Sequence, residues 1–181
     1  KTLADALALY PAVPVTAESH NGQSTLITQV GQYDAAKREL HLYNQFQVDV
    51  YYSTSLDQVA PDVTVVDGIH YAGTTSVEVK VGAQDASGIQ RVVVAYIKDS
   101  NQATNSLQSL DLTFNPSSQK WLGAFSGDTN SRFFVQVVDK AGNTRSATNK
   151  DRYYTPGLVQ GRSGSACTNQ CIFLPVIRQN K

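Results

Sequence analysis

Apolar and polar residues alternate with a period of two along much of this chain. The clearest case lies between residues 74 and 83, where Val77, Val79 and Val81 are separated by Glu78 and Lys80. Such alternation predicts a β-strand that buries one face and exposes the other. A second strand is predicted at 89–97, where a nearly continuous apolar run indicates a central position in a sheet.

The same reading extends to the rest of the second half of the chain, where Asp, Asn, Gly and Ser mark the turns. Further strands are predicted to begin at 63–66 and to occupy 107–114, 121–125, 133–137 and part of 144–154. About seven short strands at a spacing of about 8–12 residues are typical of an antiparallel sandwich. No helical pattern of useful length interrupts them, which excludes βαβ and nucleotide-binding folds. The predicted fold class is therefore all-β.

Three regions follow from this pattern. Residues 1–58 form a β-rich N-terminal segment, with a possible short helix at 2–10, a turn at 33–37 and a half-buried strand at 46–52. Residues 59–155 form the sandwich, and 156–181 form a Gly- and Ser-rich linker followed by a Cys-containing strand. Because two or three strands alone are marginal in water, the N-terminal segment is either incomplete, and packs on chain that has been removed, or it packs on the next domain or on another molecule.

Charge and hydropathy limit the partners. Lys plus Arg and Asp plus Glu both number 15, so the chain has no net charge to attract nucleic acid. No apolar run approaches the roughly 20 residues that span a bilayer, so we expect no membrane insertion. The chain starts at Lys1 and contains no Met, which suggests processing from a longer precursor. Protein partners, either a second copy or a neighbouring domain, are expected.

Three stretches resemble a known family. QDASGIQRVVVAY (84–96), LDLTFNPSSQKWLGAF (110–125) and RFFVQVVDKAGNTRS (132–146) resemble bacterial immunoglobulin-like (Ig-like or fibronectin-like) domains of secreted and surface proteins. The resemblance covers about residues 60–155 and implies a seven-stranded antiparallel Ig-like sandwich in an extracellular or cell-surface protein. It says little about function, because such sandwiches have many roles.

Four aspartates in this region are candidates for a calcium site. Asp62, Asp67, Asp85 and Asp139 could gather at one end of the sandwich and supply the oxygen ligands that calcium prefers. The sequence has no spaced D-x-D-x-D loop, and Asp, Asn and Gly are also the residues that turns need. Turn structure is the favoured interpretation, so we expect no cofactor.

No catalytic set is found. His20, His41 and His70 stand in unrelated places, and no serine lies in a G-x-S-x-G or S-x-x-K motif. Trp121 and Phe133 have the parity of core residues rather than of an exposed sugar-binding face. We therefore expect that this chain is not an enzyme.

The only two cysteines, Cys167 and Cys171, form a C-x-x-x-C motif. The spacing differs from the C-x-x-C of redox enzymes, and zinc would need a second pair. In the exported context that the resemblance implies, the two are expected to form a disulfide that staples the C-terminal strand. The alternative is that one cysteine bonds to another chain.

The last apolar run, at 172–177, is too short to cross a membrane and would be sticky if exposed. Pro175 confines it to a sheet edge, either on its own sandwich or on a neighbouring molecule. Exposed tyrosine is also common at interfaces, and one of Tyr153 and Tyr154 should face outward. The interface candidates are Tyr51, Tyr52, Ile172, Phe173, Leu174, Val176 and Ile177.

Two functions fit this picture. The first is a non-catalytic extracellular Ig-like module that serves cell-surface attachment or protein assembly, for example in a filament, through pairing of edge strands. The second is the C-terminal accessory region of a secreted hydrolase or peptidase. The short ending CIFLPVIR (171–178) resembles the ends of exported multidomain bacterial proteins, some of which are peptidases.

Overall fold

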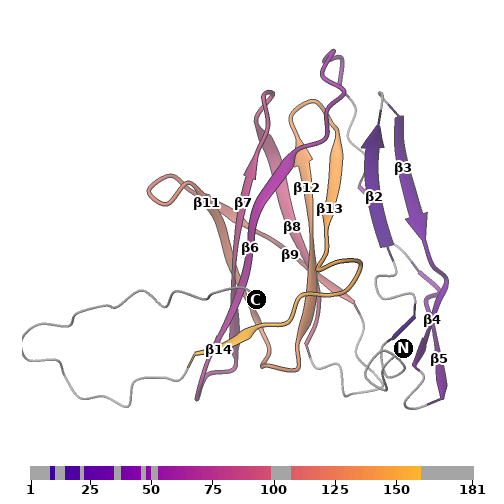
Figure 1. The fold of residues 1–181 in the computed structure, drawn as a ribbon, viewed down its shortest axis with the longest axis vertical. Coiled ribbons are helices and arrows are strands. Elements are labelled where there is room, and N and C mark those ends of the chain that lie inside the picture. The colour runs from indigo at the N-terminus through magenta and orange to yellow at the C-terminus, as the bar shows by residue number, and fades with distance from the viewer. Residues whose placement is uncertain are drawn as a thin grey trace, which may run out of the picture.

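A computed structural model describes residues 9–10, 15–20, 23–34, 38–45, 48–49, 53–98 and 107–159. Within these residues the protein is all-β and contains no helix, which confirms the predicted fold class (Figure 1). The part of the chain that the structure describes accordingly has no helix that could span a membrane.

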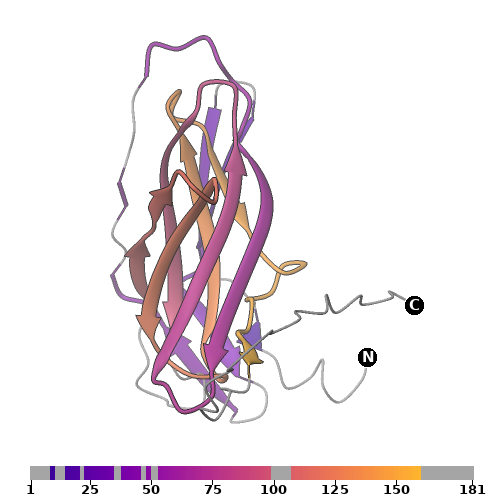
Figure 2. The same cartoon turned by 90° about the vertical axis from the view of Figure 1, so that its left-hand side faces the viewer.

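Two sheets pack against each other, and a third, smaller sheet lies at the N-terminal side (Figures 1 and 2). The six-stranded sheet has the order β3 (Gln23–Thr28), β2 (Val15–His20), β13 (Thr144–Ala147), β12 (Arg132–Asp139), β8 (Ile89–Ile97), β9 (Gln108–Asp111). The five-stranded sheet has the order β10 (Thr113–Asn115), β11 (Lys120–Ser126), β7 (Ser76–Gln84), β6 (Asp62–Tyr71), β14 (Gly157–Val159). The small sheet has the order β1 (Leu9–Tyr10), β4 (Gly31–Asp34), β5 (Glu39–Leu42).

The main core lies between the two larger sheets. The inward valines of β7 meet those of β8 and β12 around Phe133, which is fully buried. Trp121 is partly buried and packs on the same cluster, so the expectation that both aromatics serve the core is confirmed. Burying one valine or phenylalanine side chain contributes about 1.5–3 kcal/mol to the stability of the fold. The apolar positions of the period-two alternation are thus the residues that this core buries.

A second buried cluster lies on the other face of the six-stranded sheet. Ala95, Ile97, Phe134 and Tyr153 form it. Gln32 of β4 is 1% exposed, and its side chain lies beside the Tyr153 hydroxyl. The N-terminal segment therefore packs on the sandwich of its own chain at this place.

An ion pair adds to this packing. Arg91 of β8 bonds through a terminal guanidinium nitrogen to Asp49 at 2.5 Å, and it also forms a bidentate pair with Asp111 of β9. The guanidinium holds the pKa of Asp111 below its usual value, mainly through the hydrogen bond. Because all three groups reach solvent, the pair contributes little stability by itself.

Several sequence predictions are wrong in detail. Leu9 and Tyr10 pair with β4 as a strand instead of ending a helix, and Tyr33 and Asp34 lie within β4 instead of a turn. Val48 and Asp49 lie outside any strand. These stretches are short, so partners distant in sequence decide their conformation.

Two further differences concern the sandwich itself. The stretch 107–114 forms two strands, β9 and β10, because the chain passes from one sheet to the other at the buried Leu112. Within the expected linker, Gly157–Val159 forms β14, which pairs in parallel with the end of β6.

Candidate functional site

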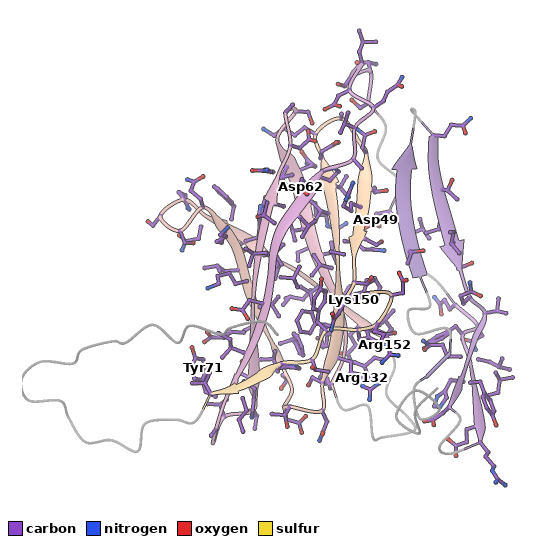
Figure 3. The ribbon with its side chains drawn as sticks, viewed as in Figure 1. Asp49, Asp62, Tyr71, Arg132, Lys150 and Arg152 are labelled. Carbon is purple, nitrogen blue, oxygen red and sulfur yellow. The ribbon has the colours of Figure 1, made fainter. Side chains whose placement is uncertain are left out.

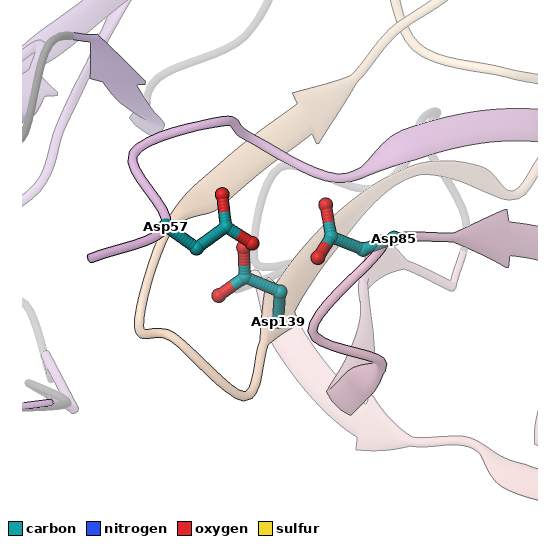
Figure 4. Close-up of side chains that lie close together, drawn as sticks. All are labelled: Asp57, Asp85 and Asp139. Carbon is teal, nitrogen blue, oxygen red and sulfur yellow. The ribbon is translucent and has the colours of Figure 1, made fainter. Parts of the chain in front are cut away.

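Two turns and the irregular segment before β6 meet at one end of the two sheets, and each brings an aspartate. Asp57, Asp85 and Asp139 each offer a carboxylate oxygen, and these oxygens lie within 4.8 Å of one another (Figure 4). Asp139 is buried, whereas Asp57 and Asp85 are partly exposed. Within the described residues, this is the group of three or more such side chains that lies close enough to hold a metal ion.

Asp139 ends β12 and begins the turn to β13. Its carboxylate accepts hydrogen bonds from the backbone N–H of Asn143 at 2.8 Å and from the Asn143 side-chain nitrogen at 2.9 Å. Gly142 adopts a φ of 89°, a left-handed conformation that glycine allows at no steric cost. The short polar side chains and the glycine therefore fix this turn locally.

Asp85 starts the turn between β7 and β8. Its carboxylate accepts hydrogen bonds from the Ser87 backbone N–H at 2.8 Å and from the Ser87 hydroxyl at 2.7 Å. The carbonyl of Gly88 accepts a hydrogen bond from the backbone N–H of Lys140 at 2.9 Å. This bond holds the β7–β8 turn against the β12–β13 turn, which explains why Asp85 and Asp139 are neighbours.

Asp57 comes from the irregular segment 53–61 that leads into β6. Its backbone carbonyl accepts a hydrogen bond from the Asn143 side-chain nitrogen at 3.1 Å. Its carboxylate accepts one from the Val59 backbone N–H at 3.0 Å. The side chain of Asn143 thus joins the entering segment to the β12–β13 turn.

Chemically, three carboxylates at one end of a sandwich make a locally negative pole that a hard cation such as calcium could neutralise. The hydrogen bonds inside each turn account for the same side-chain positions without an ion. For Asp85 and Asp139, a calcium site and a purely turn-forming role therefore both remain predictions.

The four aspartates proposed from the sequence do not form one group. Asp62 and Asp67 lie on β6, where Asp62 accepts a hydrogen bond from the Gln84 side chain at 3.4 Å and Asp67 pairs in register with Lys80. Asp57 takes part instead. It lies in the irregular stretch just before β6, outside the strand pattern and its turns, so sequence reasoning missed it.

The other candidates are placed as follows. His70 is buried, and its Nδ1 lies 3.1 Å from the carbonyl of Ser76, as expected for a core histidine. His41 lies on β5, 3.9 Å from Glu39. Tyr153 and Tyr154 point to opposite faces of the sheet, as predicted, yet Tyr153 is buried under the N-terminal segment instead of facing solvent. The candidates outside the described residues are Tyr51, Tyr52, Cys167, Cys171, Ile172, Phe173, Leu174, Val176 and Ile177.

Similarity to known proteins adds nothing to this picture. No protein-family model, curated protein or solved structure matches the chain.

Proposed function

We propose that this chain is a non-catalytic module of an exported protein, an Ig-like sandwich that serves attachment or assembly with other proteins. The partial strand orders β10-β11-β7-β6 and β13-β12-β8-β9 support the Ig-like assignment, since they put consecutive hairpins into two facing sheets. Attachment proceeds through edge strands and their apolar side chains rather than through a reacting group.

The observation that carries this proposal is the exposure of apolar side chains on the N-terminal strands. Leu26 and Ile27 are neighbours on β3, so they point to opposite faces, and they are 43% and 47% exposed. Strand β3 pairs with β2 only among the described strands, so its outer edge offers unpaired backbone groups.

The small sheet exposes apolar side chains as well. Strand β3 leads directly into β4, and on its partner β5 the side chains of Leu40 and Leu42 are 61% and 70% exposed. We call Leu26, Ile27, Leu40 and Leu42 the N-terminal apolar surface. Exposed apolar side chains beside an open strand edge are typical of a protein interface.

Light scattering after size-exclusion chromatography tests the proposal on the full chain. We expect association that grows with concentration over about a hundredfold range. Replacement of Ile27 and Leu42 by Lys should weaken it. Leu56→Lys is the matched control, because Leu56 is 95% exposed but lies outside this surface.

Two results would count against the proposal. A wild-type chain that stays monomeric at every concentration would remove self-assembly. Equal loss of association in the Leu56 control would show that the N-terminal apolar surface is not the contact.

A further inference from the structure

A groove runs along the open side of the sandwich between β6 and β13. Its volume is about 340 Å³, and both of these strands and Tyr154 line it. Val63 and Val66 of β6 and Ala147 of β13 are partly buried at its floor, where they pack on the core. Thr64, Arg145, Ser146 and Thr148 also line the groove, so polar groups surround these three apolar side chains.

One wall of this groove is an open strand edge. Strand β6 extends from Asp62 to Tyr71, whose positions mark its two ends in Figure 3. Strand β14 covers only Ile69 to Tyr71, and no other described strand pairs with this edge.

The backbone groups at this edge can be assigned. The N–H of Ala72 donates to the Val159 carbonyl at 2.9 Å, so from Ala72 back to Val66 every second residue turns its N–H and C=O to the same side. A register shift between Val63 and Val65 interrupts this alternation closer to the start of β6. Val66 is the first residue of this alternation beyond the reach of β14. Its backbone can hydrogen-bond to an added strand.

The sequence after β14 contains a segment suited to this edge. Residues 172–177 (IFLPVI) are apolar at every position, so either face of an extended strand made from them would suit the floor of the groove. Pro175 has no N–H, so the edge of the strand that carries its backbone groups must face away from the sheet. Ile172, Leu174 and Val176 then present their backbone to β6, and Pro175 blocks further strand addition on the outside.

The linker is long enough to allow this. Twelve residues, 160–171, separate Val159 from Ile172 and can span up to about 40 Å. Val159 pairs with Tyr71, and the five residues from Tyr71 back to Val66 cover about 17 Å of strand. A chain that turns back after β14 would run antiparallel to β6.

We propose that residues 172–177 of the same chain bind as an edge strand along β6 between Asp62 and Val66 and close the groove between β6 and β13. The occupant is this chain's own segment because the linker starts on the same strand edge, which gives the segment a high local concentration. The proposal concerns a single molecule and does not depend on assembly through the N-terminal apolar surface.

Cysteine cross-linking tests this on the full chain. In a background with Cys167→Ser and Cys171→Ser, Val65→Cys is combined with Val176→Cys. The control replaces Val65→Cys by Phe114→Cys, which has similar exposure but lies on β10 at the opposite edge of the same sheet. We expect an intrachain disulfide at least about tenfold faster for the Val65 pair, at a rate unchanged by dilution.

Hydrogen exchange on the chain with its natural cysteines gives a second test. Leu174→Asp should speed exchange of the Val66 amide by at least about tenfold, whereas Gln179→Asp, with the same added charge, should not. Amides of β11 should stay unchanged in both variants.

Three outcomes would overturn the proposal. Equal rates for the Val65 and Phe114 pairs would mean that the segment has no preferred edge. A disulfide between chains, slowed by dilution, would assign the groove to a second copy. Unchanged exchange at Val66 in Leu174→Asp would show that β6 remains uncovered.

Discussion

Asn143 donates two hydrogen bonds to the carboxylate of Asp139, one from its backbone and one from its side chain. Both residues are at least nine-tenths buried. The same side-chain nitrogen reaches the carbonyl of Asp57, which is 86 positions earlier in the sequence. The side-chain amide of Asn143 thus helps to satisfy a buried carboxylate and also joins the N-terminal region to the sandwich.

The first prediction concerns this amide. Asn143→Ala removes one donor from the buried Asp139 carboxylate and releases Asp57, so we expect a loss of about 1–3 kcal/mol in the free energy of unfolding. Asn115→Ala is the control, because the Asn115 side chain accepts only one exposed backbone hydrogen bond. Urea unfolding measures both. Equal losses in the two variants would contradict a special role for Asn143.

The second prediction concerns repulsion among the three carboxylates. Asp57→Asn keeps the oxygen that accepts the Val59 N–H and removes one of three neighbouring charges. In EDTA we expect the free energy of unfolding to rise by about 0.5–1 kcal/mol. Asp67→Asn, outside the group, should give no such rise.

Repeating the measurement in excess calcium chloride separates repulsion from ion binding. A cation held by all three carboxylates would make Asp57→Asn less stable than wild type under that condition. If the variant loses stability in EDTA, repulsion is not the dominant effect at this pole.

The sequence predicts some strands and some residues of the aspartate group, but not others. The apolar run at 89–97 lies between two turns and predicts the strand at its observed bounds. Asp85 and Asp139 were recognised because they begin turns. Asp57 was not, because only the long-range bond from Asn143 brings it to the site.

The burial of Tyr153 shows the same limit. Alternation along the strand predicts that Tyr153 and Tyr154 face opposite sides of the sheet, which is correct. It cannot predict that Gln32 from the N-terminal segment covers the outer side. Packing between segments distant in sequence leaves no periodic signal in either of them.

The third prediction concerns the turn after β13, marked by Lys150 and Arg152 in Figure 3. Asn149 and Arg152 exchange backbone hydrogen bonds of 2.8 and 3.2 Å, and Lys150 and Asp151 between them have φ values of 54° and 61°. These angles define a type I′ turn, which favours glycine at its second central position.

Asp151→Gly should therefore stabilise the protein by about 0.5–1 kcal/mol, after the added freedom of glycine in the unfolded chain is subtracted. Asp151→Ala is the matched control and should bring no gain, since it keeps a side chain at positive φ. Thermal unfolding ranks the three proteins. A lower melting temperature for the glycine variant would mean that the Asp151 side chain stabilises the turn.

The fourth prediction concerns the hydroxyl of Tyr153. The side chain is 6% exposed, and among the described residues no group meets hydrogen-bond geometry with the hydroxyl, although Gln32 lies close. Burial raises the pKa of Tyr153 well above its ordinary value, and the nearby Tyr43 adds to the rise. A buried hydroxyl without a partner costs about 1–3 kcal/mol, so Tyr153→Phe should be neutral or stabilising at pH 7.

The pH dependence separates the hydroxyl from the ring. The unfolded chain releases the Tyr153 proton near pH 10, whereas the folded protein keeps it, so the unfolded state binds fewer protons above that pH. The free energy of unfolding of the wild type should therefore fall as pH rises above about 10. Tyr153→Phe should fall less steeply, since it lacks this contribution and, among the described tyrosines, keeps those of Tyr43 and Tyr154, whose pKa values burial also raises. Identical slopes for the two proteins between neutral pH and pH 11 would show that the Tyr153 hydroxyl reaches water in the folded state.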